Sequence, residues 1–407
     1  MNEIAGRNWR VIVGDVIDGL RTLPDNSVQC CVTSPPYWGL RDYGVDGQIG
    51  LEPTPKDFTD KMVEVFEEVR RVLRPDGTCW VNIGDSYATD TGGGGPSEKQ
   101  TSNHGAWTTG RRDNVKASGL KRKDLVGIPW RLAFALQDAG WWLRSEIIWH
   151  KRSPMPESVT DRPTKSHEQI FLLTKSESYF FDQEAVKEGS VTGGKHNLRF
   201  SPNRAIAMGR KASGNELSGG ADAVRGETRN IRTVWTLSSE SFKGAHFATF
   251  PTEIPRRAIA AGTSEKGCCP TCGTPWRRII EKDRVATRPG IDSKINRASD
   301  DADSPYERQS GMIVGNRDPN RHMTTTNTVG WESGCECGHA ETVPCVVLDP
   351  FSGSGTSGMV ATEMGRIYIG CELNPEYAEM SRKRIDSWKT RDAVKATKST
   401  SGQKPLF

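Results

Sequence analysis

The sequence lacks any long apolar run, which excludes the membrane-spanning class of protein. No stretch approaches the roughly 20 consecutive apolar residues that a transmembrane helix requires. The first residues also lack the basic stretch followed by an apolar segment that marks a secretory signal. The sequence therefore predicts a cytoplasmic protein with no membrane partner.

The chain also lacks a strong net charge, because its formal charge is only +4 over 407 residues. A charge this small identifies no partner by itself. Residues 187–257 are more basic, with twelve Lys or Arg against six Asp or Glu. A polyanionic partner would explain this local excess, and a solvated loop would explain it equally well.

A disulfide framework is not expected, although the chain has ten cysteines, because cytoplasmic proteins keep their thiols reduced. Five cysteines crowd into two short stretches, 268–272 and 335–337, and this clustering indicates metal ligation. Four thiolates around one ion are typical of a structural zinc site, which would tie a polar insert to the core. The expected ligands are Cys269, Cys272, Cys335 and Cys337, with Cys268 and His339 as substitutes. The alternative is a group of free thiols.

Apolar segments of strand length alternate with segments of helical periodicity along most of the chain. Strands are expected at residues 9–13, 28–33, 78–83, 143–149, 169–174, 346–349 and 367–372, and helices at 55–73, 126–138, 254–261, 356–364 and 375–388. Polar or glycine-rich residues 90–112, 189–232 and 281–331 are expected to be loops or insertions, and 389–407 a frayed end. The alternation predicts an α/β fold with a doubly wound, mostly parallel, Rossmann-like sheet.

A Ser-Pro-Pro-Tyr motif directly follows the apolar strand at residues 28–33. Its members are Ser34, Pro35, Pro36 and Tyr37. Two consecutive prolines stiffen the backbone and remove two N–H donors, so the motif presents a hydroxyl, backbone carbonyls and an aromatic face. These groups suit the activation of a base amine: Ser34 Oγ and the Pro35 carbonyl would accept its protons, and Tyr37 would stack on the base. A rigid proline turn without a chemical role is the alternative.

A glycine loop follows the predicted strand at residues 346–349 and opens a helix, which is the context of a nucleotide-type binding loop. Its candidate binding residues are Asp349, Pro350, Phe351, Gly353, Gly355 and Thr356. The next predicted strand ends in Glu372, and a carboxylate about twenty residues after such a loop suits a ribose diol.

The two motifs together, TSPPYW and DPFSGSGT, resemble those of the β-group amino-methyltransferases of DNA. The catalytic motif precedes the cofactor motif, as in the circularly permuted fold of that group. The resemblance implies transfer of a methyl group from S-adenosylmethionine to an exocyclic amine of a flipped-out base, without a catalytic metal. It also implies cofactor contacts from Asp15, near the adenine, and from Phe250, in a segment (246–251) that covers the methionine moiety.

The same resemblance favours cytosine N4 as the target, because Ser at the position of Ser34 is commoner among enzymes of that specificity than Asp. Adenine N6 is the alternative, followed by methylation of RNA or of a protein amide. A catalytically silent DNA-binding protein of the same fold is the alternative from another class, although the complete motifs argue against it.

The resemblance further implies double-stranded DNA as the substrate, a cognate restriction endonuclease as a partner, and a nucleoid-associated protein of bacterial or phage type. Expected DNA contacts are Lys151, Arg152, Arg162 and Lys165, with Arg199, Arg204, Arg225, Arg229 and Arg232 as further candidates. The expected division is a catalytic half (1–185), a target-recognition or insertion region (186–245), a cofactor-covering helix (246–266), a zinc-binding insert (267–344), a cofactor-binding half (345–390) and a flexible tail (391–407). The methyltransferase prediction requires that Tyr37 and Phe351 lie close to one common site.

Overall fold

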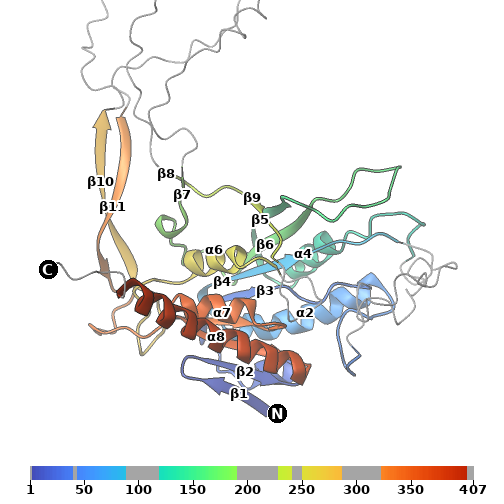
Figure 1. The fold of residues 1–407 in the computed structure, drawn as a ribbon, viewed down its shortest axis with the longest axis horizontal. Coiled ribbons are helices and arrows are strands. Elements are labelled where there is room, and N and C mark those ends of the chain that lie inside the picture. The colour runs from blue at the N-terminus through green and yellow to red at the C-terminus, as the bar shows by residue number, and fades with distance from the viewer. Residues whose placement is uncertain are drawn as a thin grey trace, which may run out of the picture. The chain divides into compact units, whose positions relative to one another are not determined.

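The computed structural model describes residues 2–39, 44–88, 119–189, 228–240, 250–286 and 322–400 (Figure 1). The chain divides into two compact units. The first comprises Met1–Val186, Arg232–Arg277 and Trp331–Phe407, and the second comprises Lys187–Ile231 and Arg278–Gly330. The predicted loop at 90–112 and most of the one at 189–232 lie outside the described residues. No helix in the described ranges is both long and apolar enough to cross a bilayer.

The first unit is built on a sheet whose described strands follow the order β1-β2-β13-β12-β3-β4-β6-β5-β9. These strands are β1 (Asn2–Gly6), β2 (Trp9–Val13), β3 (Val28–Thr33), β4 (Leu73–Ile83), β5 (Trp142–Lys151), β6 (His167–Thr174), β9 (Val234–Leu237), β12 (Val346–Asp349) and β13 (Ile367–Glu372). Only the pairs β1–β2, β4–β6 and β5–β6 are antiparallel. The prediction of a mostly parallel sheet is therefore confirmed.

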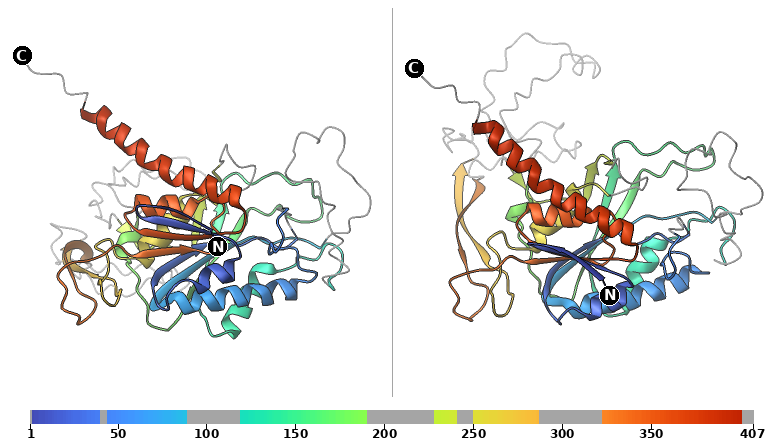
Figure 2. Two further views of the ribbon diagram at one scale, coloured as in Figure 1. Left: turned by 90° about the horizontal axis from the view of Figure 1, so that it is seen from below. Right: turned by 60° about the horizontal axis from the view of Figure 1, so that its bottom comes forward.

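Helices cover both faces of this sheet, as Figure 2 shows. The helices α1 (Val16–Arg21), α2 (Pro55–Val72) and α4 (Ile128–Asp138) pack together on one face, and α6 (Glu253–Gly262), α7 (Thr356–Glu363) and α8 (Pro375–Thr400) pack together on the other. A short 3-10 helix, η2 (Glu184–Val186), contacts α6. The doubly wound arrangement is thus confirmed.

The helix α2 illustrates how the sequence builds this core. Thr54 caps its first turn, since its Oγ1 accepts a hydrogen bond from Asp57 N at 3.1 Å, and Pro55 occupies a position that needs no N–H donor. The apolar side chains at helical spacing, which include Phe58, Met62 and Phe66, are completely buried. They form the centre of the hydrophobic core beneath the sheet.

The strand after α2 begins earlier than expected. We predicted a strand from residue 78, but β4 starts at Leu73 and includes Pro75, Asp76 and Gly77. The pairing with β3 shifts register between Val28 and Cys30, an irregularity that accommodates the proline and glycine within the strand.

Two further predictions were wrong. Residues 281–331 were expected to be a loop or insertion without strands, but residues at both ends of this range belong to β10 (Arg277–Ala286) and β11 (His322–Glu332), which form a two-stranded sheet. Most of its side chains are polar, so the sequence shows no regular alternation of apolar residues, and the cross-strand hydrogen bond from Arg278 Nη1 to Thr328 Oγ1 supports the pairing. Helix α8 was expected to end at residue 388 but continues to Thr400, because Ala- and Lys-rich sequence favours helix even without an apolar face.

The second unit also contains the short pair β7 (Glu188–Gly189) and β8 (Thr228–Arg229).

Candidate active site and metal site

The two sequence motifs meet at the carboxyl edge of the sheet. Strand β3 lies between β12 and β4 and is parallel to both, so the segments after all three strands emerge at one edge. The Thr33 Oγ1 hydroxyl donates a hydrogen bond to Asp349 Oδ1 at 2.7 Å, across 316 residues of sequence. Tyr37 and Phe351 both pack against the same hydrophobic core. The segments expected to hold the base and the cofactor are therefore neighbours.

Beside Ser34 lies a hydrogen-bonded cluster that the sequence did not reveal. The Tyr37 hydroxyl donates to Glu168 Oε2 at 2.7 Å, and Lys151 Nζ donates to Glu168 Oε1 at 2.6 Å. Asn82 Nδ2 lies 3.0 Å from Glu168 Oε2, 3.1 Å from the Tyr37 hydroxyl and 3.5 Å from Ser34 Oγ. Asn82 and Glu168 come from β4 and β6, and the only sequence signal was a polar residue in or next to an apolar strand.

The ring of Tyr37 is held by close packing against Gly84. A Cβ on Gly84 would approach ring atom Cε2 of Tyr37 to 2.6 Å, which no side chain tolerates. Glycine at position 84 therefore leaves room for the Tyr37 ring, while Glu168 and Asn82 fix the position of the Tyr37 hydroxyl. Ser34 and Tyr37 are half-buried, Pro35 is buried, and Pro36 is partly buried between them.

The glycine loop and Glu372 are joined directly. Gly353 N donates to Glu372 Oε2 at 2.7 Å, and Asn374 N donates to Glu372 Oε1 at 2.9 Å. Gly353 has a φ of 51°, and a Cβ built on it would meet nothing closer than Phe351 O at 3.9 Å. The positive φ of Gly353 thus favours glycine, and the space beside its Cα is open.

Burial raises the pKa of both carboxyl groups on this side of the site. It raises the pKa of Asp349 to about 6, although hydrogen bonds from Thr33 and the Phe351 backbone oppose the shift. It raises the pKa of Glu372 to about 7, against the backbone hydrogen bonds from Asn374 and Gly353. Perturbed carboxyl groups of this kind are concentrated at functional sites.

The other predicted cofactor residues lie at or near the same edge. Asp15 follows β2, which pairs with β13, and its Oδ1 caps helix α1 by accepting from Ile17 N at 2.9 Å. Thr356 is buried, and its hydroxyl accepts a hydrogen bond from Arg384 at 2.7 Å, so its side chain is committed within the protein. Phe250 is partly buried just before α6, and residues 246–249 lie outside the described ranges.

Three of the four predicted DNA-binding side chains have partners within the protein. Besides the ion pair of Lys151, Lys165 Nζ lies 3.8 Å from Asp85 Oδ2, and Arg162 Nη1 donates to Glu157 at 2.7 Å. Arg152 is exposed. Of the further candidates, Arg229 pairs with Glu188 at 3.2 Å. Arg232 is exposed, and Arg199, Arg204 and Arg225 lie outside the described residues.

The four cysteines predicted to bind zinc come together. The Sγ atoms of Cys269, Cys272, Cys335 and Cys337 all lie within 4.8 Å of one another. The two substitutes point elsewhere: the Cys268 thiol donates to Val343 O at 3.5 Å, and His339 Nε2 hydrogen-bonds to Thr271 Oγ1 at 2.7 Å.

The turn that carries the first cysteine pair is anchored to the central sheet. Gln29 Nε2 donates to Gly273 O at 2.9 Å, and Arg74 donates to Cys272 O and, at 3.0 Å, to Thr274 Oγ1. Gln29 and Arg74 belong to β3 and β4, so the cluster is tied to the strands that carry the Ser34 and Asn82 segments.

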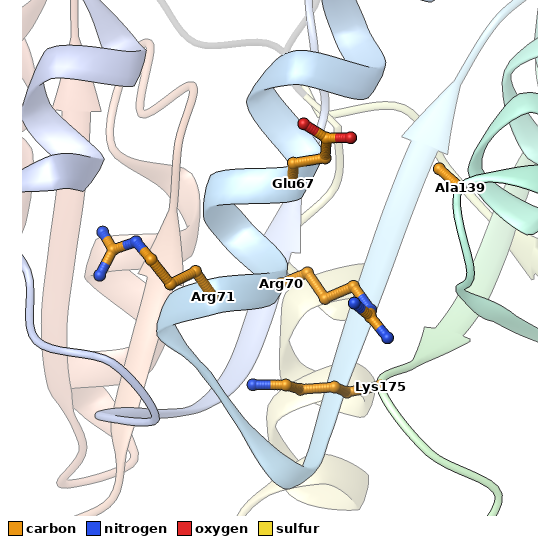
Figure 3. Close-up of a pocket in the computed structure, with 5 residues that line it drawn as sticks. All are labelled: Glu67, Arg70, Arg71, Ala139 and Lys175. Atoms are coloured by element: carbon orange, nitrogen blue, oxygen red, sulfur yellow. The ribbon is translucent and has the colours of Figure 1, made fainter.

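A cavity of about 320 Å³ lies at the opposite edge of the sheet. It is lined by Glu67, Arg70, Arg71, Ala139 and Lys175, which Figure 3 shows around the end of α2. Lys175 Nζ donates to Leu73 O, at the first residue of β4, at 2.9 Å. The cavity is therefore separate from the site at the carboxyl ends of the strands.

Comparison with known proteins is consistent with this geometry. A family model described as DNA methylase, of the N6/N4 methyltransferases, matches residues 28–269 and 345–383. The Type II methyltransferase M.Cfr9I of Citrobacter freundii is 39% identical over 372 residues, which cover 91% of this chain and 86% of that protein. M.XycI of Xanthomonas campestris pv. cyanopsidis is 38% identical, covering 93% and 88%, and M.SmaI of Serratia marcescens is 36% identical, covering 93% and 91%.

Proposed function

The chain belongs to the N6/N4 DNA methylase family, as a β-group amino-methyltransferase, and from this membership we propose that it methylates the N4 amine of cytosine in double-stranded DNA. The methyl donor is S-adenosylmethionine, and the target cytosine is flipped out of the duplex because a stacked base cannot reach the site. The observation that best supports this proposal is the hydrogen bond between Thr33 and Asp349, which joins the Ser-Pro-Pro-Tyr segment to the glycine loop.

Ser34 and Pro35 activate the target amine. The lone pair of this amine is delocalised into the ring, so the amine is a weak nucleophile. Acceptors at Ser34 Oγ and the Pro35 carbonyl take hydrogen bonds from its two protons and localise the lone pair on nitrogen. The Tyr37 ring, packed on Gly84, stacks on the base. Fixed acceptors of this kind stabilise the positive charge that develops on nitrogen as the new bond forms.

The residues around the glycine loop fit the proposed cofactor. The open space beside Gly353 admits a ligand close to the backbone, and the Glu372 carboxylate retains lone pairs for a ribose diol. Asp15 lies at the next strand end, where it would contact the adenine, and Phe250 covers the methionine part. When bound, the cofactor supplies an electrophilic methyl group on a sulfonium.

The choice of cytosine over adenine depends on Ser34. In the family that the motifs resemble, Ser at this position is commoner among enzymes that methylate cytosine N4, and Asp is commoner among enzymes that methylate adenine N6. Both bases present an NH2 group that a hydroxyl accepts from, so adenine N6 is the second candidate. A catalytically silent DNA-binding protein is the third.

The test is mass spectrometry of nucleosides from unmethylated plasmid DNA incubated with the protein and isotopically labelled S-adenosylmethionine. We expect labelled N4-methylcytosine at specific sites. Labelled N6-methyladenine would replace the first candidate by the second. Absence of label in DNA, with RNA and protein assayed in parallel, would overturn the proposed DNA methylation.

We also propose a Type II context, because the relatives above are Type II methyltransferases. In that context a cognate restriction endonuclease cuts the same site, and methylation protects it. Residues 186–245 are proposed to hold the target-recognition region, and the exposed Arg152 to contact a phosphate. Protection of plasmid DNA from an endonuclease of matching specificity would identify the site.

For the cysteine cluster we propose one structural Zn²⁺ held by four thiolates. In a tetrahedral cage with Zn–S bonds of about 2.3 Å, the sulfurs lie about 3.8 Å apart. The observed limit of 4.8 Å needs only a small closure. Because the cysteine pairs flank residues 278–330 in the sequence, the ion would fasten both ends of this segment, whose sequence has little apolar content.

Metal analysis tests the zinc proposal. We expect about one zinc per chain in the wild type and loss of zinc in Cys335→Ser, with a lower unfolding temperature. Cys268→Ser is the matched control, because Cys268 lies beside the cluster without belonging to it. Wild-type protein without zinc, or equal loss in both variants, would overturn the assignment.

A further inference from the structure

The amide of Asn82 and the carboxylate of Glu168 lie beside Ser34 but have no part in the transfer described above. Asn82 is 2% exposed, and the Glu168 side chain is 13% exposed. Burial of polar groups is unfavourable unless they are hydrogen-bonded, so a buried amide–carboxylate pair next to a reacting group calls for an explanation.

The contacts of Glu168 fix which way the Asn82 amide is turned. Glu168 pairs with Lys151 at 2.6 Å and is therefore an acceptor of hydrogen bonds. Only the NH2 end of Asn82 can face such an acceptor, because the carbonyl end would repel it. Nδ2 consequently lies toward Glu168, the Tyr37 hydroxyl and Ser34 Oγ.

This orientation leaves the other end of the amide without a partner. Asn82 Oδ1 is buried, and no described residue donates a hydrogen bond to it. An unsatisfied buried acceptor costs roughly 1 to 3 kcal/mol. Local costs of this kind are expected at functional sites, where the orientation of a residue serves the function.

We propose that Glu168 is a positioning residue for the methyl transfer: it holds Tyr37 and Asn82, and Asn82 in turn orients the Ser34 hydroxyl. Lys151 completes the arrangement by fixing the second oxygen of Glu168. The inference rests on the proposed function, and it identifies the residues that hold the Ser34 acceptor in position.

A purely structural role predicts a different outcome from a positioning role. If the cluster only stabilised the fold, its variants would lose folded protein and cofactor affinity together with activity. A positioning role instead lowers kcat while the cofactor site, on neighbouring strands, binds as before. Misplacement of reacting groups by about 1 Å lowers rates about 100-fold.

The first experiment measures kcat, KM for DNA and the cofactor dissociation constant for Glu168→Gln. This variant keeps the size of the side chain but removes the charge that fixes Tyr37, Asn82 and Lys151. We expect kcat to fall about 100-fold, with less than about twofold change in cofactor affinity. Glu64→Gln is the control, because Glu64 forms a similar pair with Lys61 at 2.8 Å on the surface of α2.

The second experiment exchanges the two groups. Asn82→Asp puts a second carboxylate about 3 Å from Glu168, and two carboxylates at that distance share a proton, which raises the pKa of one of them. Activity of this variant should recover relative to wild type as the pH falls from 8 to 6. The double variant Asn82→Asp/Glu168→Gln restores one amide and one carboxylate, and should regain at least about tenfold in kcat over Asn82→Asp at pH 8.

Wild-type protein in the same assay separates the two levels of inference. If the wild type transfers no methyl group to DNA, the proposed function fails. If the wild type is active and Glu168→Gln retains its kcat, or loses kcat and cofactor affinity equally, the positioning role is overturned. Additive effects in the double variant, without recovery, would overturn the amide–carboxylate pairing itself.

Discussion

Glu168 and the two carboxyl groups of Asp349 and Glu372 lie at the same edge of one sheet, but only Glu168 has a cation beside it. Lys151 Nζ is 2.6 Å from Glu168 Oε1. Among the described residues, the donors to Asp349 and Glu372 are neutral, namely the Thr33 and Ser357 hydroxyls and backbone N–H groups. The catalytic side is thus charge-compensated, and the cofactor side is not.

The difference corresponds to what each side is proposed to bind. A base amine is neutral and needs acceptors held in fixed positions, and the paired Glu168 holds the Ser34 acceptor in position through Asn82. The proposed cofactor carries a sulfonium and a ribose diol, and its arrival would compensate carboxylates that are costly to bury without a partner. Burial raises the pKa of Asp349 and Glu372 because this compensation is missing.

The largest expected effect tests the catalytic side. Ser34→Ala removes the acceptor for the target amine, so we expect kcat to fall by about 100- to 1000-fold, as for the loss of one fixed hydrogen-bonding group. Cofactor affinity should change less than about twofold, since the hydrogen bond described for Ser34 Oγ is with Asn82 Nδ2, outside the glycine loop. Ser27→Ala, at the opposite end of the same segment, is the control. Equal activity would remove Ser34 from the mechanism.

The second prediction concerns the stability of the cofactor-free protein. The Asp349 carboxyl has a pKa of about 6 in the folded protein, above the ordinary value of 3.8, so protonation of Asp349 favours the folded state. This contribution to stability is complete below about pH 4 and is lost as the pH rises through 6. The difference corresponds to at most roughly 3 kcal/mol. Asp349→Asn should therefore be more stable than wild type at pH 8 and not at pH 4. Denaturant unfolding at the two pH values measures this, and an equal difference at both would contradict it.

The third prediction concerns cofactor affinity. Glu372→Gln keeps an oxygen acceptor but removes the charge, so hydrogen bonds to the ribose weaken and we expect a dissociation constant about tenfold higher. Calorimetric titration measures it. Glu376→Gln, in the first turn of α8 and exposed, is the control. An unchanged constant would refute the ribose role of Glu372.

The sequence indicated more of the residues that the structure brings together on the proposed cofactor side than on the proposed catalytic side, and the reason is physical. The loop with Gly353 and the later Glu372 are close in sequence, and glycines that follow an apolar strand are a local signal. Ser34 to Tyr37 were also local. Asn82 and Glu168 are neighbours of Ser34 only because β4 pairs with both β3 and β6. This strand pairing cannot be predicted from a single sequence.

The same distinction explains the errors in the fold. Buried strands such as β3 and β12 are apolar runs and were expected. The strands β10 and β11 are paired through their backbones and polar side chains, so they lack the apolar alternation by which strands are found. Lys151 was expected to contact DNA because it is basic, although the structure pairs it with Glu168; only a three-dimensional neighbour distinguishes the two roles.

The smallest expected effect is the pH dependence of cofactor binding, which separates the two sides most directly. Glu372 has a folded pKa of about 7 in the cofactor-free protein, so below pH 7 it is largely protonated and must lose its proton to accept two hydroxyl groups. Affinity should therefore fall several-fold as the pH drops from 8 to 6, by at most about tenfold for each pH unit below the pKa. The readout is the ratio of dissociation constants of Glu372→Gln and wild type at each pH, so that titration of the cofactor itself cancels. This ratio should decrease toward low pH. A ratio that stays constant from pH 6 to 8 would mean that Glu372 does not titrate with binding, and the contrast between the two sides of the site would lose its electrostatic basis.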